Sequence, residues 1–256
     1  MKLGIMQPCF LPYLGYFQLI HAVDRFLLYP NVSFTRAGWT HRNRILLKWG
    51  GPMYVHLPVR KASGGTRIAE VLLDDRDPAW RRKLLATVHH NYAASPFFAE
   101  TWPLIREVIM AQPAGLHAFN AHGIRRIAAH LGLHAEIISD GKPYLDIEER
   151  LEPQAASPAP AGTADLPASP ERKTARILAL CQRESADCYV NLIGGLSLYD
   201  REVFRAHGLR LLFVSTRDLS YRQFSPDFHP RLSILDVLMH NGLEGTKRLL
   251  GQYSLI

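Results

Sequence analysis

The sequence predicts an α/β fold with a largely parallel sheet and helices on both of its faces. Short apolar runs alternate with longer helical patterns near both ends of the 256-residue chain, which is the arrangement of β–α units. Between residues 44 and 58, two alternating runs flank Trp49-Gly50-Gly51-Pro52, and this turn sequence predicts a β-hairpin insertion. No internal repeat with a solenoid or propeller period competes with this prediction.

Residues 1–150 are expected to form an N-terminal α/β part that contains the hairpin and a helical segment. Strands are predicted at 2–6, 25–29, 44–48, 53–58, 68–73 and 135–139, and helices at 13–23, 78–90, 98–110 and 116–130. Asp77-Pro78 favours a helix start, because an aspartate can cap the first N–H groups and proline suits the first turn. Gly132 ends the last of these helices.

Residues 151–172 read LEPQAASPAPAGTADLPASPER and contain almost no large apolar side chain. Such a segment cannot bury enough surface to offset the entropy of ordering it, so we predict a flexible linker. The alternating pattern resumes over 173–256, with helices at 173–183, 198–206, 233–240 and 243–253 and strands at 188–193 and 209–214. This C-terminal α/β part is expected to pack on the same core as the first.

Composition excludes several classes of protein. Hydrophobic residues make up 47% and charged residues 21%, and no apolar run reaches the roughly 18 residues of a membrane span. Without a recognisable signal peptide, a cytoplasmic location is expected. Cys9, Cys181 and Cys188 lack the spacing of a metal site or a disulfide framework, so no metal is expected. The net charge of +7 comes from scattered arginines without a nucleic-acid-binding motif, so nucleic acid is not expected as a partner.

The stretch MQPCFLPYLGY, after the first predicted strand, is the first candidate site. In a β–α unit this loop lies at the carboxyl edge of the sheet, where open α/β sheets bind ligands. The next helix offers free N–H groups to an anion. Gly15 would permit close approach, and the prolines preset the loop shape. Our substrate-binding candidates are Gln7, Pro8, Tyr13, Gly15 and Tyr16. The alternative is a tight connection whose aromatic side chains pack in the core.

The order of strand, proline-containing loop, helix and strand resembles the start of the nucleotidylyltransferases, in which a His-x-Gly-His turn binds the triphosphate. Tyr13-Leu14-Gly15-Tyr16 stands in that place here. Tyrosine donates a hydrogen bond but carries no positive charge at neutral pH. The resemblance therefore implies a shared Rossmann-like fold more than a shared reaction. An enzyme that binds ATP or a nucleotide sugar remains an alternative.

Four separated blocks resemble the WbqC-like family, which is found in bacterial O-antigen (surface-polysaccharide) and secondary-metabolite gene clusters. The blocks are IMQPCFLPYLGYFQLIHAVDRFLLYPNVSFTRAGWTHRNRI at 5–45, YVHLPV at 54–59, CYVNLIGGLSLYDREVF at 188–204 and SYRQFSPDFHPRLSILDVLMHNG at 220–242. The resemblance implies a transferase that joins an acyl or aminoacyl group to the amine of an amino sugar or small metabolite. Where the family often has a D-D-V-Q tract, this chain has Pro30-Asn31-Val32-Ser33, which predicts a changed substrate or a weaker activity.

The run Trp39-Thr40-His41-Arg42-Asn43-Arg44 is the second candidate site. Arg42 and Arg44 suit bidentate capture of a phosphate or carboxylate. Asn43 can donate and accept hydrogen bonds, and Trp39 can stack on a base or a sugar ring. The alternative is a charged loop that Trp39 anchors in the core.

Further candidates lie in the C-terminal part. Gly194-Gly195, between a strand and a helix, either cradles a phosphate with its N–H groups or forms a tight turn, and Tyr199 beyond it binds substrate or packs in the core. Tyr221 and Gln223 follow the strand at 209–214, where they could orient a polar ligand.

Three residues are candidates for catalysis. Arg42 would stabilise developing charge. Asp236 would act as a general base, or else would complete the helix cap that Ser233 begins. Cys9 lies before a helix N-terminus, which can lower the pKa of a thiol and so favour a thioester intermediate, whereas a small buried cysteine is the alternative.

The sequence therefore predicts an acyl or aminoacyl transferase that acts on a small-molecule substrate, either an amino sugar or a nucleotide sugar. A thioester donor would make coenzyme A or an acyl carrier protein the partner, and the basic surface would suit an acidic carrier. The sequence names no cofactor. A non-enzymatic binding protein in polysaccharide assembly is the remaining alternative.

Overall fold

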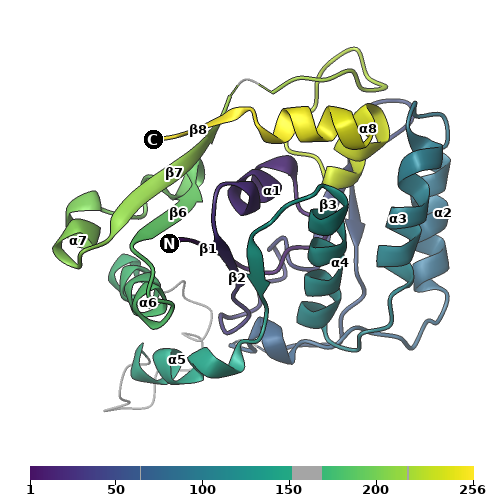
Figure 1. Ribbon diagram of the computed structural model, residues 1–256. Helices are drawn as coiled ribbons and strands as arrows, with labels where there is room; N and C mark the ends of the chain where they lie inside the picture. Colours follow the sequence, from purple (N-terminus) through teal and green to yellow (C-terminus); the bar gives the residue numbers. More distant parts are fainter. Residues whose placement is uncertain (64, 152–168, 218) are drawn as a thin grey trace.

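A six-stranded sheet forms the centre of the molecule (Figure 1). The structure, a computed structural model, describes residues 1–63, 65–151, 169–217 and 219–256. The strand order is β5-β2-β1-β6-β7-β8, and every neighbouring pair is parallel except β7 with β8. The strands are β1 Lys2–Met6, β2 Arg25–Leu28, β5 Glu136–Ile138, β6 Cys188–Leu192, β7 Arg210–Thr216 and β8 Tyr253–Leu255. The predicted α/β fold with a largely parallel sheet is confirmed.

Helices cover both faces of this sheet. They are α1 Leu14–His21, α2 Trp80–Tyr92, α3 Phe98–Met110, α4 Leu116–His130, α5 Leu145–Leu151, α6 Pro170–Arg183, α7 Arg201–Ala206 and α8 Ile234–Leu250. Figure 1 shows α6 and α7 on the left, α5 below the strands, and α2, α3 and α4 on the right. The side chains of β2 show how the sheet contributes to a helical layer on each face, because successive side chains of a strand point to opposite faces. Phe26 and Leu28 join the core with α1–α4 and α8, whereas Leu27 joins the core with α5–α7.

The predicted hairpin is present as a separate two-stranded antiparallel sheet. It consists of β3 Arg42–Leu46 and β4 Pro52–His56. Gly50 and Gly51 form its turn with φ values of 99° and 84°, a conformation that glycine adopts without the steric cost of a Cβ. Residues in register across the hairpin include Arg42 with His56 and Arg44 with Tyr54.

Several element predictions were wrong. The strand expected at 68–73 is the short 3₁₀-helix η1, Ile68–Glu70, because the carboxylate of Glu70 accepts a hydrogen bond from the Arg67 N–H and closes a turn. The break expected between the helices at 233–240 and 243–253 is present, because Gly242 is non-helical and divides α8 into two helical parts, but the second part ends at Leu250 and not at residue 253. Helix α5 and strand β8, both short, were not predicted.

The predicted linker is only partly covered by the structure. Helix α6 begins at Pro170, and Ser169 caps it by accepting a hydrogen bond from the Arg172 N–H, so the end of the 151–172 segment is helical. Leu151 is the last residue of α5. The rest of the predicted linker, 152–168, lies outside the described residues. Strands from both predicted α/β parts belong to the same sheet.

Candidate functional site

The strand order reverses between β1 and β6. From β1 the chain continues to β2 on one side, and β6, β7 and β8 extend the sheet on the other. Because β1 and β6 are parallel, the loops that follow them leave from the same edge. Open α/β sheets bind ligands in the crevice at this point. The first candidate loop, 7–13, and the Gly194-Gly195 turn therefore share the carboxyl edge of the sheet.

Loop 7–13 is held rigid by buried polar side chains. Each donor comes from a different part of the fold and binds a backbone carbonyl of the loop. The hydrogen bonds run from Tyr16 Oη to Gln7 O (2.8 Å), Asn120 Nδ2 to Pro8 O (2.9 Å), Asn43 Nδ2 to Phe10 O and Leu11 O (2.9 and 2.6 Å), and Ser233 Oγ to Leu11 O (2.8 Å). Leu11 is held at a φ of 40°, which is uncommon for a residue with a side chain. The fold thus over-determines the shape of this loop.

The aromatic residues of the loop divide between core and surface. Tyr16 is buried and packs edge-on against Phe17 and Phe26, so its hydroxyl serves the loop backbone. Tyr13 is half-buried, and its ring lies over Gly15, where a Cβ would come within 2.5 Å of it. Burial raises the pKa of Tyr13 to about 12, against the nearby positive charge of Arg231. Tyr13 therefore keeps its proton at neutral pH and can donate it in a hydrogen bond.

The exposed face of the hairpin combines aromatic rings with guanidinium groups. Trp39 and Tyr54 are 44% and 45% exposed, and their rings stack with centroids 6.1 Å apart and planes 26° apart. The guanidinium of Arg42 lies 4.9 Å from the Tyr54 ring and 5.8 Å from Trp39, and that of Arg44 lies 5.8 Å from Trp39. Because Arg42 and Arg44 alternate along β3, they share this face. We call these four residues the hairpin face.

Backbone carbonyls hold both arginines in place. Arg42 donates from Nε to Gly38 O (3.2 Å) and from Nη2 to Ala37 O (2.5 Å). Arg44 donates from Nη2 to Pro230 O and Arg231 O, at 3.4 Å each. In the described ranges, neither guanidinium has a carboxylate partner. Carbonyl oxygens orient the groups without neutralising them, so their charge remains available to an anion.

Arg231 is a candidate that the sequence did not indicate. It precedes α8, adopts a φ of 58°, and lies close enough to Tyr13 to affect its pKa. The bridge between Tyr13 and Ser233 places this segment beside loop 7–13. A left-handed residue next to a candidate site is a common mark of functional strain.

Two histidines near the hairpin face are neutral at neutral pH. Burial, and then the charges of His56 and Arg42, lower the pKa of His41 to about 4. Burial and Arg42 also lower the pKa of His56, which is exposed and sits opposite Arg42 in the hairpin register. An exposed neutral imidazole can accept a proton. The hairpin register around the Gly50-Gly51 turn would have predicted the pairs of Arg42 with His56 and Arg44 with Tyr54.

Asp236 is fully buried and accepts three side-chain hydrogen bonds. The donors are Tyr92 Oη (2.8 Å), Tyr221 Oη (2.7 Å) and Gln223 Nε2 (3.0 Å). Two of the predicted substrate-binding residues, Tyr221 and Gln223, are thus brought together with Asp236 and bind its carboxylate. Ser233 caps α8 as predicted, by accepting from the Leu235 N–H, but Asp236 does not complete the cap, because the Ser233 N–H donates to the Arg44 carbonyl (2.9 Å). Asp236 therefore positions the segment before α8, and it has no surface for a substrate.

Cys9 does not have the environment of a nucleophile. Burial raises the pKa of its thiol to about 12, so the expected lowering by the helix N-terminus was wrong. Desolvation outweighs the helix dipole, because the free energy of hydration that a thiolate loses on burial exceeds the stabilisation that the dipole supplies. A thiol with this pKa is protonated at neutral pH, and covalent catalysis through Cys9 is disfavoured.

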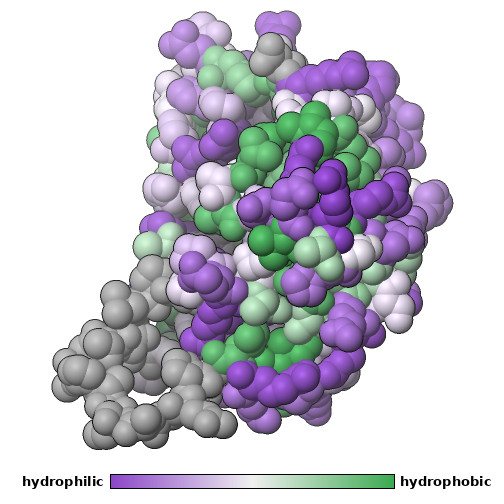
Figure 2. All heavy atoms as spheres, turned by 90° about the vertical axis from the view of Figure 1, so that its left-hand side faces the viewer, coloured by the Kyte–Doolittle hydropathy of each residue, from purple (hydrophilic) through white to green (hydrophobic). Residues whose placement is uncertain are grey.

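The turn after β6 forms the other flank of the carboxyl edge. Gly195 lies in η4, Ile193–Gly195, and a Cβ there would meet the Asn191 amide at 2.5 Å, whereas Gly194 faces open space. Tyr199 packs against Tyr189 in the core. Around this turn several apolar side chains are exposed, namely Ile193, Leu196, Leu198 and Val203. Figure 2 shows apolar side chains among hydrophilic ones on this side of the molecule.

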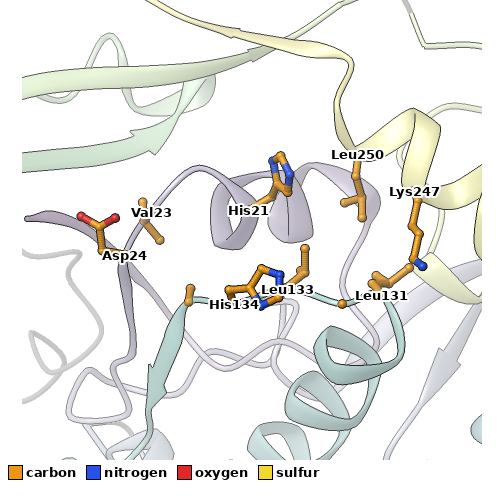
Figure 3. Close-up of a pocket in the computed structure, with 10 residues that line it drawn as sticks. His21, Val23, Asp24, Leu131, Leu133, His134, Lys247 and Leu250 are labelled. Carbon is orange, nitrogen blue, oxygen red and sulfur yellow. The ribbon is translucent and has the colours of Figure 1, made fainter.

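A hollow of about 790 Å³ lies elsewhere, between α1, the α4–β5 connection and the end of α8 (Figure 3). Three of its polar side chains are already engaged, whereas His134 has no hydrogen-bond partner in the described part of the chain. His21 Nδ1 bonds Tyr253 Oη (3.0 Å), Lys247 pairs with Glu244 (3.1 Å), and Asp24 accepts from the Lys2 N–H (2.7 Å). Since Asp24 precedes β2, this hollow lies at the amino edge, and no predicted site residue lines it. The chemistry favours the carboxyl edge, because free charge is found there.

Fold and geometry together define an α/β protein with a rigid candidate ligand loop at the carboxyl edge of a parallel sheet. The chain belongs to the WbqC-like protein family, whose model matches residues 7–248. It is 28% identical over 248 residues to the "Uncharacterized protein Rv1507c" of Mycobacterium tuberculosis, with 95% of each chain covered. No solved structure matches the chain. In the described part of the chain, no helix is long and apolar enough to cross a membrane.

Proposed function

We propose that the protein is a group transferase that joins an acyl or aminoacyl group to the amine of an amino sugar or a similar small metabolite. The observation that carries this proposal is the pairing of Arg42 with His56 beside loop 7–13. It places an oriented positive charge next to a neutral imidazole. Amide formation needs both groups, one to stabilise negative charge and one to accept a proton.

The reaction proceeds in one transfer step without an acyl-enzyme. The amine nitrogen attacks the donor carbonyl carbon, a C–N bond forms, and the bond from that carbon to the leaving group breaks. His56 accepts the proton that the nitrogen loses. Arg42 stabilises the negative charge that develops on the carbonyl oxygen, and Tyr13 can donate a hydrogen bond to the same oxygen. With a thioester donor, the sulfur leaves as a thiolate and takes the proton back from His56.

A transfer assay tests this proposal. Acyl thioesters of coenzyme A and of a carrier protein are incubated with free and nucleotide-linked amino sugars, and mass spectrometry detects the amide. We expect Arg42→Ala and His56→Gln each to slow transfer by about 100-fold, the usual effect of removing one such group. Trp49→Ala is the matched control, because Trp49 is 85% exposed at the turn of the same hairpin.

Two results would contradict the proposal. Transfer at the wild-type rate by Arg42→Ala would remove the hairpin from the catalytic site. Absence of amide with every donor and acceptor, from a protein that still binds them, would favour a binding protein over a transferase.

A further inference from the structure

We infer that the hairpin face binds a nucleoside diphosphate group, with the base stacked on Trp39 and the phosphates held by Arg42 and Arg44. The inference rests on the proposed function, because it names the class of substrate that this site takes. Nucleotide sugars and coenzyme A both carry a base joined to a diphosphate. A nucleotide sugar is a form of the acceptor, and acyl coenzyme A is a form of the donor. The experiment below separates these two sources.

The two exposed rings are suited to an aromatic ligand. Trp39 and Tyr54 each leave nearly half of their surface open, and their planes are close to parallel. Most large aromatic side chains bury themselves, since each removes a large apolar area from water. Here the two rings stay nearly half exposed although they contact each other and the guanidinium groups of Arg42 and Arg44. A planar base that stacks on the indole would bury this area. Any of the bases could stack in this way, because every base has a π-face.

The arginines supply the second half of the recognition. Each is fixed through Nη2 to a backbone carbonyl, and each keeps Nη1 without a hydrogen-bond partner in the described part of the chain. A guanidinium fork matches the oxygens of a phosphate. Two such groups on the same face, two residues apart along β3, match the two phosphates of a diphosphate better than they match a single carboxylate.

The stacking surface is joined directly to loop 7–13. The Trp39 carbonyl accepts a hydrogen bond from the Phe10 N–H (3.1 Å), and Asn43, between the two arginines, binds the Phe10 and Leu11 carbonyls. A base on Trp39 therefore places its diphosphate next to the loop at the carboxyl end of β1. Whatever group the diphosphate carries is then held near Tyr13 and His56.

Isothermal titration calorimetry tests the inference on the full-length protein at fixed ionic strength. The probes are UDP, dTDP, coenzyme A, uridine, inorganic pyrophosphate and a single-stranded RNA oligomer. We expect UDP, dTDP or coenzyme A to bind at least tenfold more tightly than uridine or pyrophosphate, because only these probes join a base to phosphates. Trp39→Ala and Arg44→Ala should each weaken that binding about tenfold or more.

Trp49→Ala, which removes an exposed tryptophan from the turn of the same hairpin, should leave the affinity unchanged. Should Trp39→Ala fail to fold, Tyr54→Ala removes the other ring of the stack. Tight binding of UDP and dTDP identifies the acceptor as the source of the nucleotide, and tight binding of coenzyme A alone identifies the donor.

Three outcomes would overturn the inference. Pyrophosphate that binds as tightly as UDP would define a simple anion site, and a single-stranded RNA oligomer that binds more tightly would define a nucleic-acid surface. Unchanged affinity in both Trp39→Ala and Tyr54→Ala would place the nucleotide elsewhere.

Nucleotide binding with the expected variant pattern, but without transfer, would remove the transferase and keep this site. Transfer that is insensitive to Trp39→Ala would keep the transferase and remove this nucleotide site.

Discussion

At the scale of single residues, buried amides set the shape of the candidate loop. Asn43 is buried between the two partly buried arginines of β3, because neighbours along a strand point to opposite faces. Its side chain donates to two loop carbonyls and accepts from the Arg44 N–H. The sequence identified Asn43 as a polar residue in the right block. It could not show that the side chain faces inward, since that depends on the hairpin register.

Asn43→Ala should lower the free energy of unfolding by about 2 kcal/mol or more. It leaves buried carbonyl groups without a donor, and each such group costs about 1–3 kcal/mol. Urea denaturation measures the change. Gln112→Ala is the control, because Gln112 is exposed and bonds only the nearby Met110 carbonyl, and it should change stability by less than about 0.5 kcal/mol. Equal effects of the two substitutions would show that Asn43 does not hold the loop.

His41 should make the protein less stable in acid. Its pKa is about 4 in the folded chain, below the 6.5 of a free histidine. Between these two values the unfolded chain binds a proton that the folded chain does not, so the free energy of unfolding falls as pH falls from about 7 to about 4. His41→Gln should flatten this dependence in urea titrations across that range. Identical slopes for the two proteins would show that His41 titrates normally.

Cys9 and Asp236 show where sequence reasoning at this scale fails. Cys9 lies in the loop before α1 and Asp236 in the first turn of α8, and near a helix start a thiolate or a carboxylate can be reactive. Their protonation and access depend on burial by segments far away in the chain, such as Tyr92 and Tyr221 for Asp236. No local pattern reports that burial.

At the scale of elements, turn residues predicted both the hairpin and the break in the last helix. Gly50-Gly51 fixed the hairpin, and the register then follows from the turn. Helices were predicted on both sides of Asn241-Gly242, and α8 has its non-helical residue at Gly242. The Phe97 ring packs against Gly242 at this break.

Gly242→Ala should therefore destabilise the protein by about 2 kcal/mol or more. Gly242 has a φ of 63°, and a Cβ there would lie 2.5 Å from the Phe97 ring, so both strain and overlap oppose the new methyl group. Gly251→Ala is the matched control at the end of the same helix. Gly251 has a φ of −74° and no atom closer than 3.7 Å to the added Cβ, and it should change the melting temperature little. Equal melting temperatures for the two variants would contradict this account.

At the scale of the whole molecule, the alternation of strands and helices predicted the class of fold but not its assembly. Pairing of β1 with β6 joins residues near 2–4 to residues near 188–190. No short-range pattern contains that contact, and it alone creates the reversal of strand order at the candidate site. The antiparallel β8 was missed for the same reason, since a three-residue edge strand has no periodicity to detect.

In the described part of the chain, two candidate places for a ligand lie at opposite edges of the sheet. The amino edge has a hollow in which His21, Asp24 and Lys247 are already paired, and the carboxyl edge has oriented, unpaired charge beside a rigid loop. The volume of the hollow favours the amino edge as the ligand site, whereas the unpaired guanidinium groups favour the carboxyl edge. We assign function to the carboxyl edge because binding and catalysis require groups that the fold itself leaves unused.

Hydrogen–deuterium exchange of the full chain, with and without saturating UDP or coenzyme A, decides between the two edges. The predicted result is slower exchange in peptides that cover loop 7–13 and the hairpin strands at 42–46 and 52–56, with no change around 131–135 or 247–250. Slower exchange confined to 131–135 and 247–250 would place the ligand in the amino-edge hollow and would contradict the assignment of the site.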